Sequence, residues 1–347
     1  MLIGNYQESY RSDEALLRTP AVRGWMAALA VAALAFPFMA GDYLLYLVNL
    51  MGVLAIAALG LNILTGFTGQ ISLGHAAFMG VGGFGAAFLA SRLSVPFWLA
   101  VPAGGAMACL AGVVVGVPSL RIKGLYLAIA TLAAQVIAEW IFVNWTSATG
   151  GIRGLNVPPA RLFGLPLDTD FKIYFLVQSA AAAHVWFAAN LFRTRWGRAF
   201  IAVRDRDIAA ELIGVPLFRT KILSFMVSSF YAGIAGGLWA FFVKVVTPEN
   251  FPLSLSIQLL AMVIVGGLGS IKGTLFGAAF MTLVPEVLKL AVTGLRGVWP
   301  EAQSYLFPMR DVVFGTLIVA FLIFEPHGLA EMWNRTKRFF ALWPFEK

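Results

Sequence analysis

Long apolar runs separated by short polar breaks dominate the chain. A helix crosses the roughly 30 Å hydrocarbon core of a bilayer in about 20 residues, and backbone groups in lipid must pair internally. Each run is therefore predicted to be a transmembrane helix. Reading between the breaks gives ten: 24–41, 43–64, 75–91, 95–117, 124–145, 172–192, 222–243, 254–269, 273–293 and 309–325. The third, eighth and tenth are short and interrupted by glycine or flanked by polar residues, so a tilted, broken or re-entrant segment is an alternative there.

Composition leads to the same fold class. The 347 residues are 60% hydrophobic and 12% charged, whereas soluble domains carry about 25% charged residues. Between Gly24 and Leu120 the only formally charged residues are Asp42 and Arg92. We therefore predict an all-α fold, a polytopic transmembrane helical bundle, and disfavour soluble enzymes and nucleic-acid-binding proteins. The single cysteine, Cys109, excludes an intrachain disulfide and a cysteine-rich metal site.

The basic residues orient this bundle, because cytoplasmic loops carry an excess of Lys and Arg. With a cytoplasmic N-terminus, 17 of the 25 basic residues fall on the inner side and eight on the outer side. We therefore expect a cytoplasmic tail at 1–23, a transmembrane domain at 24–325 with a cytoplasmic loop at 193–221, and a cytoplasmic tail at 326–347. The first tail is mostly polar, so no cleavable signal peptide is predicted before the first span.

A polar, glycine-rich segment joins the second and third predicted spans. Non-helical backbone at membrane depth is tolerated only where it is buried in protein or faces water. We interpret the segment as part of a translocation pathway or its inner gate, with a polar surface loop as the alternative. The residues assigned to the pathway are Gly66, Thr68, Gly69, Gln70, Ser72, Gly74 and His75.

The sequence contains two further glycine patterns. The spacing of Gly66-x-x-Gly69-x-Ile71 recurs as Gly266-x-x-Gly269-x-Ile271. Transporter folds are often built from structural repeats, although recurrence by chance of abundant residues is equally consistent with the pattern. Gly80-x-Gly82-x-x-Gly85 resembles a dinucleotide fingerprint by letter, but it lies in an apolar run and is interpreted as small-residue helix packing.

The loop 193–221 contains a predicted amphipathic helix over 200–215. Its apolar positions recur at roughly helical spacing: Phe200, Ile201, Val203, Ile208, Leu212 and Ile213. Such a helix docks in a groove of a partner protein or lies on anionic lipid. The mixed charges of residues 204–207 favour a protein partner. On the outer side, the loop 146–159 is predicted to be a compact turn, either a contact for an external delivery protein or a plain connection.

Ionisable residues within the predicted spans are functional candidates, because charged groups are costly in a membrane. Glu286 and Lys289 are three residues apart and are predicted to pair, and Glu139 and His184 are expected to make a polar helix contact or line the pathway. The chain contains no ATP-binding loop, zinc-type spacing or catalytic triad. We therefore expect no catalytic residues, no metal and no cofactor.

Five stretches together resemble one known family. The stretch from Gly60 to Phe78 is similar to the hallmark of the bacterial branched-chain amino acid ABC transporter permeases of the LivM type in the LivH/LivM family. Further matches to the same pattern are Leu120–Leu132, Thr149–Leu155, Gly197–Gly214 and Val265–Gly273. The resemblance runs from about residue 43 to residue 327. Urea permeases and related carriers for amides or aromatic acids share these motifs, so the substrate stays open.

The resemblance implies a complex in the bacterial inner membrane. Its expected partners are a LivH-type permease subunit, two cytosolic ATP-binding subunits, a periplasmic substrate-binding protein and membrane lipid. It also implies that the 200–215 helix couples transport to the ATPases, although Ala-Ala-Glu replaces the Glu-Ala-Ala order of the family motif. The residues assigned to coupling are Arg204, Asp205, Arg206, Ala209, Ala210, Glu211 and Gly214.

We therefore predict a permease subunit of an ABC importer that carries branched-chain or other hydrophobic amino acids into the cytoplasm. The alternatives are a permease of the same family for urea, amides or aromatic acids, and an ion-coupled secondary transporter. Ion coupling needs buried carboxylates, and few are available in the predicted spans.

Overall fold

A computed structural model describes residues 20–119, 124–162, 165–295, 306–325 and 327–342. Each of the ten predicted apolar ranges coincides with a helix. These helices are α2 (Pro20–Met39), α3 (Asp42–Thr65), α4 (His75–Arg92), α5 (Phe97–Ser119), α6 (Leu125–Asn144), α8 (Asp170–Leu191), α11 (Leu217–Val243), α12 (Leu253–Gly266), α13 (Ile271–Leu295) and α14 (Leu306–Phe324). The predicted tail 1–23 lies largely outside the described residues.

Fewer of these helices qualify individually as membrane spans than the sequence prediction assumed. Within the described residues, six helices are long and apolar enough to cross a membrane, and up to eight if each of two bent pairs is one span. One bent pair is α8 with the following helix, at 74°, and the other joins the end of α14 to the last helix, at 47°. The chain is thus an all-α polytopic helical protein, and ten spans are not established.

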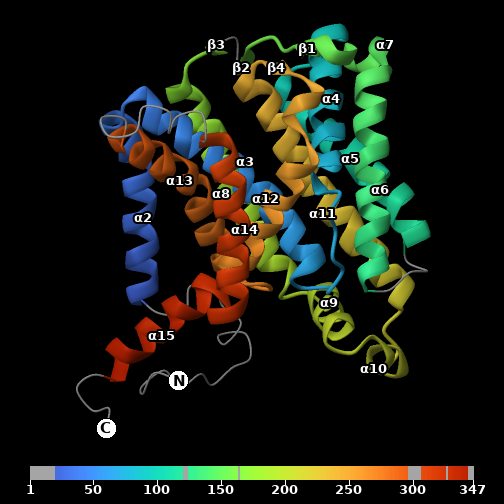
Figure 1. Cartoon of the computed structure of the whole chain (residues 1–347), viewed down its shortest axis with the longest axis vertical. Coiled ribbons are helices and arrows are strands. Elements are labelled where there is room, and N and C mark those ends of the chain that lie inside the picture. The colour runs from blue at the N-terminus through green and yellow to red at the C-terminus, as the bar shows by residue number, and fades with distance from the viewer. Residues whose placement is uncertain (1–19, 120–123, 163–164, 296–305, 326, 343–347) are drawn as a thin grey trace.

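Helices α3, α4, α5 and α11 form the core of the bundle, with α8, α12 and α13 packed around α3. In the most apolar stretch of α3 and of α11, 72% of the residues are buried, against 28% in α6 and 33% in α13. Figure 1 shows α2 standing at the edge of the bundle, where the carbonyl oxygen of Ala33 accepts a hydrogen bond from Tyr174 of α8 at 2.8 Å. The apolar surfaces of α6 and α13 are therefore available to lipid or to another membrane subunit.

The crossing of α4 and α11 depends on glycine. A Cβ atom added to Gly82 would overlap the backbone of Gly233, and one added to Gly236 would overlap the carbonyl of Met79. Small residues at such a crossing let two helix backbones approach closely in a membrane protein. The prediction that the Gly80–Gly85 pattern serves helix packing is confirmed.

Short elements cover the end of the bundle at the top of Figure 1. They are α7 (Thr146–Thr149), η1 (Gly151–Arg153), β1 (Leu155–Asn156), β2 (Ala160–Leu162), β3 (Leu165–Leu167), β4 (Val245–Val246) and η2 (Pro248–Asn250). Strands β1 and β4 pair antiparallel, with Leu155 opposite Val246, and β2 and β3 form a hairpin. The predicted turn 146–159 is thus a compact structure of α7, η1 and β1, and β1 joins it to β4 in a small sheet.

The opposite end carries α9 (Arg195–Asp205), α10 (Asp207–Leu212) and α15 (Gly328–Leu342). Helix α15 lies within the predicted C-terminal tail and is amphipathic. Its Arg335 forms an ion pair with Glu325 at 3.0 Å, which ties α15 to the end of α14. Helices α9, α10 and α15 therefore lie at the same end of the bundle. The turn that follows α3 is also at this end, because Arg204 of α9 contacts Gly66.

Candidate functional site

The glycine-rich segment 66–74 folds back into the protein. Helix α3 ends at Thr65, yet α4 begins at His75, whose Nε2 lies 2.9 Å from the carbonyl oxygen of Ala57. Ala57 precedes the end of α3 by about two helical turns, or about 12 Å at 1.5 Å per residue. The segment is therefore a re-entrant, non-helical stretch that runs beside α3.

The polar side chains predicted to line a pathway are packed inside this chain. Thr68 donates to the carbonyl oxygen of Ile63 at 2.8 Å, and Gln70 Nε2 donates to Ser224 Oγ on α11 at 2.7 Å. Thr68, Gln70, Ser72 and His75 are all buried, as is Gly74. The exposed residues of the segment are Gly69 and Ile71, with Ile71 41% exposed.

Side chains from two other helices accept hydrogen bonds from the first backbone N–H groups of α4, which are buried. The first N–H groups of a helix have no partner within the helix. Here the N–H of Ala76 donates to Ser256 Oγ on α12 at 2.8 Å, and the N–H of Ala77 donates to Gln135 Oε1 on α6 at 2.7 Å. Sequence reasoning missed Ser256 and Gln135, although each is a polar residue within an apolar run.

The two recurring glycine patterns lie against each other. The turn between α12 and α13 contacts the turn that follows α3, because a Cβ on Gly66 would overlap the N–H of Gly269. Gly69 and Gly269 have nearly the same left-handed backbone, with φ of 73° and 75°. Asn62 joins the turns: its Oδ1 accepts from the Gly269 N–H at 2.9 Å, and its Nδ2 donates to Thr274 Oγ1 at 2.7 Å. The two turns form one junction.

The predicted single helix over 200–215 is wrong. It is broken at Arg206, whose backbone is extended (φ −156°, ψ 99°), into α9 and α10. Asp207 opens α10 with a negative charge in the first turn, which favours a helix start, and Gly214, with φ of 90°, follows its end. Lys221 on α11 pairs with Asp207 at 3.6 Å and anchors α10 to the bundle.

The break divides the predicted apolar stripe into two halves. On α9, Phe200 and Val203 are buried in the chain, with exposed fractions of 0% and 5%. On and after α10, Ile208, Leu212 and Ile213 are 68%, 83% and 79% exposed. Of the other predicted coupling residues, Ala210 is buried, whereas Asp205, Arg206, Ala209, Glu211 and Gly214 are exposed.

Arg204, one of the residues predicted to serve coupling, reaches the glycine-rich segment. Its Nη1 donates to the carbonyl oxygen of Gly66 at 3.0 Å, and its Nε pairs with Asp205 at 3.1 Å. The predicted coupling and pathway residues, which are far apart in the sequence, thus meet at Arg204.

The predicted intramembrane pairs have different outcomes. Lys289 and Glu286 do pair, at 3.9 Å, as predicted. Glu139 instead accepts a hydrogen bond from Gln135 at 2.9 Å, while the His184 ring packs edge-on against Tyr231 at 4.8 Å between centroids.

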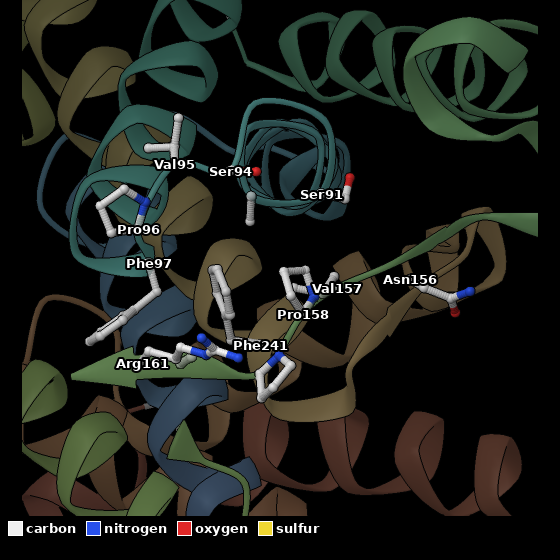
Figure 2. A pocket seen from close by; sticks show the side chains of 13 residues that line it. Ser91, Ser94, Val95, Pro96, Phe97, Asn156, Val157, Pro158, Arg161 and Phe241 are labelled. Carbon is white, nitrogen blue, oxygen red and sulfur yellow. The ribbon is translucent and has the colours of Figure 1, made fainter. Parts of the chain in front are cut away.

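A pocket of about 670 Å³ opens at the opposite end of the bundle. Figure 2 shows residues from the end of α4, the start of α5 and the strand region around this hollow, with Arg161 beside Phe241. The lining carries the polar side chains of Ser91, Ser94, Asn156 and Arg161 among apolar residues. The hollow is therefore open to a polar solute or to a loop of another protein.

Comparison with known proteins identifies relatives along most of the chain. The family described as "Branched-chain amino acid transport system / permease component" matches residues 43–322. The high-affinity branched-chain amino acid transport system permease protein LivM of Escherichia coli (strain K12) is 30% identical over 332 residues, covering 89% of this chain and 75% of LivM. No solved structure shows a significant match.

Two further relatives are more distant or match a shorter stretch. The probable permease LivH of Methanocaldococcus jannaschii is 27% identical over 43% of this chain and 45% of its own length. The autoinducer 2 import system permease protein LsrC of Klebsiella pneumoniae subsp. pneumoniae is 30% identical over 53% of this chain and 54% of its own length. All these relatives are named as transport permeases, a role that requires no catalytic residues. With the family match extending over all the core helices from α3 into α14, the chain belongs to the permease components of branched-chain amino acid transport systems.

Proposed function

We propose that this chain is the permease subunit of an ABC importer that carries branched-chain or other hydrophobic amino acids into the cytoplasm. The observation that carries the proposal is the exposed apolar surface of α10, formed by Ile208, Leu212 and Ile213. A helix of six residues is too short to be stable alone in water. The ion pair of Asp207 with Lys221 fixes α10 to the bundle while Ile208 and Leu212 stay exposed, which suits insertion into a groove of another protein.

In this proposal the partner at α10 is one of two cytosolic ATP-binding subunits. The apolar residues enter a groove of the ATPase, while Arg206 and Glu211 contact its rim. Motion of the ATPase on binding ATP then reaches the permease through α9, because Phe200 and Val203 are embedded in the bundle. A LivH-type permease subunit supplies the other half of the pathway.

The orientation belongs to the same proposal. Both termini and the loop 193–221 lie in the cytoplasm, the chain crosses the inner membrane in ten spans, and a periplasmic binding protein meets the opposite end. The pocket beside Arg161 lies at that end and is suited to receive the solute. The segment 66–74 acts as an inner gate, with its exposed Gly69 and Ile71 facing the pathway.

Two alternatives differ in substrate or energy source. A relative named for autoinducer 2 import shows that the family is not confined to amino acids. Ion coupling is less favoured, because Glu286 is engaged by Lys289 and by the Tyr43 hydroxyl, and Glu139 is engaged by Gln135.

The test is reconstitution of the chain with a LivH-type subunit, the ATPases and the binding protein in proteoliposomes. We expect uptake of labelled leucine that requires ATP. The double variant Ile208→Asp/Leu212→Asp should lose the ATPase subunits on copurification, because two charges would enter an apolar contact. Ile152→Asp is the matched control, since Ile152 is 75% exposed at the other end of the bundle. Retention of the ATPases by the double variant would contradict docking at α10.

A further inference from the structure

The guanidinium of Arg204 lies between the two glycine turns. Its Nη1 donates to the Gly66 carbonyl oxygen at 3.0 Å, and a Cβ added to Gly269 would lie only 2.7 Å from the same Nη1. Gly66 ends α3, and Gly269 precedes α13. One side chain of α9 therefore touches the ends of two helices that are about 200 residues apart in the sequence.

Glycine accommodates the whole Arg204 side chain. A Cβ on Gly69 would lie 3.3 Å from Arg204 Cγ, 3.4 Å from its Cα and 3.7 Å from its Cβ. Both Gly69 and Gly269 also need a left-handed backbone, which other residues adopt at a cost. The two turns thus combine the backbone shape and the space that an inserted arginine requires.

Asn62 makes the two turns move together. It binds the Gly269 N–H through Oδ1 and the Ser270 carbonyl oxygen through Nδ2, at 2.9 and 3.1 Å. A displacement of the Gly66 turn is therefore passed to the start of α13. Val203, adjacent to Arg204, is buried, so the base of the Arg204 side chain follows the body of α9.

We propose that Arg204 is a positioning residue that links α9 to both glycine turns as a fixed connection, so that movement of the coupling helices displaces α3 and α13 together. This inference rests on the proposed importer function and assigns to Arg204 a role inside the permease rather than at the ATPase surface. The planar guanidinium suits it, because its N–H groups point outward in one plane, so that Nε holds Asp205 while Nη1 holds the Gly66 carbonyl.

Arg198 provides a matched control. It lies on the same helix, carries the same charge and, like Arg204, is exposed. Its Nη1 donates to the carbonyl oxygen of Arg193 at 3.1 Å, at the start of the loop 193–221. Replacing either arginine by glutamine removes one positive charge from α9, but only Arg204→Gln removes the contact with the glycine turns.

The first experiment measures labelled leucine taken up per ATP hydrolysed in proteoliposomes of the complete complex. For Arg204→Gln we expect normal recovery of the ATPase subunits, continued ATP hydrolysis, and a ratio lowered about tenfold or more, as for loss of a charge-assisted hydrogen bond. Arg198→Gln should keep the wild-type ratio. An unchanged ratio in Arg204→Gln overturns the inference, and so does loss of the ATPases from that variant, which would place Arg204 at their surface.

The second experiment replaces the contact by a covalent bond. The 3.7 Å between a Cβ on Gly69 and the Cβ of Arg204 falls within the Cβ separation of disulfides, about 3.5–4.5 Å, and formation of the bond is confirmed by the loss of free thiols; the left-handed backbone at position 69 strains the cysteine in both redox states alike. We expect Gly69→Cys/Arg204→Cys, in a Cys109→Ser background, to couple when oxidised and to lose coupling on reduction. Each sample is its own folding control. If the leucine taken up per ATP hydrolysed stays the same on reduction, or rises, the inference that Arg204 is a fixed connection is overturned.

The two proposals fail in different ways. A wild-type complex without ATP-dependent uptake contradicts the importer function. A wild-type complex that transports, together with an Arg204→Gln complex that is equally coupled, contradicts only the role of Arg204.

Discussion

Asn62 is the residue whose removal should most directly loosen the junction of the two glycine turns. It is fully buried on α3, with 0% of its surface exposed. Its side chain makes three hydrogen bonds: to the Gly269 N–H, the Ser270 carbonyl oxygen and Thr274 Oγ1. We predict that Asn62→Ala destabilises the folded protein and that the loss comes from these bonds.

The magnitude follows from which partners can re-pair. Thr274 Oγ1 already donates to the Ser270 carbonyl oxygen at 2.9 Å, so those two groups keep each other. The Gly269 N–H loses its acceptor. A buried donor left without a partner costs about 1–3 kcal/mol, and a typical hydrogen bond contributes about 1 kcal/mol. We therefore expect Asn62→Ala to lower the free energy of unfolding by about 2–3 kcal/mol.

Asn49 is the matched control on the same helix. It is also 0% exposed, but it makes one hydrogen bond, from Nδ2 to the Asp170 carbonyl oxygen at 3.1 Å. Its Oδ1 is buried without a partner among the described residues. Truncating Asn49 therefore removes one bond and one unsatisfied oxygen, and Asn49→Ala should cost only about 0–1 kcal/mol.

The assay is unfolding of the purified variants by titration with sodium dodecyl sulfate, followed by tryptophan fluorescence at fixed detergent and lipid. The informative quantity is the difference between the two asparagine variants, since both lose the same atoms from the same helix. Equal losses, or a loss in Asn62→Ala within about 0.5 kcal/mol of wild type, would refute the assignment of the junction to Asn62.

Three other outcomes are expected. Gly236→Leu should prevent tight packing of α4 on α11 and lower the yield of folded protein, whereas Gly41→Leu, with open space around its Cβ, should not. The hydrogen bond from Lys172 lowers the pKa of Asp168 in the folded protein. The carboxylate therefore stabilises the fold above its unfolded-state pKa, and this contribution is lost as the pH falls through the lowered folded-state pKa. The melting temperature of Asp168→Asn should be lower than that of wild type at neutral pH and equal to it in acid. A cysteine at Thr194, in a cysteine-free background, should resist an impermeant reagent in intact spheroplasts, and labelling there would reverse the proposed topology.

The helices were largely predictable, because a long apolar run in lipid has few other options. The predicted span 43–64 differs by one residue at each end from α3. The break at Arg206 was not predictable, since the amphipathic spacing continues across it while the backbone does not. The spacing of apolar residues predicts which of them share a helix face. It does not predict that the half of this face on α9 is buried within the chain.

The junction itself depended on information that the sequence pattern does not carry. The contact of Arg204 with Gly66 joins residues 138 positions apart, and the bond from Asn62 to Gly269 joins residues 207 positions apart. The recurring glycine spacing was equally consistent with a structural repeat and with chance, and nothing in it placed the two turns side by side. Polar residues such as Gln70 were assigned to a pathway from the sequence, whereas the burial of Gln70 against Ser224 is visible only in the packed structure.

The buried start of α4 constrains how the protein is made. The N–H of Ala76 has its acceptor on Ser256, a residue synthesised 180 positions later. At about 5–20 residues per second, a ribosome needs roughly 10 to 40 s to cover that distance. Throughout this interval the first turn of α4 lacks its permanent partner, so water or the insertion machinery must hold it. In a nascent chain interrupted before α12, the N–H of Ala76 therefore never meets its native acceptor.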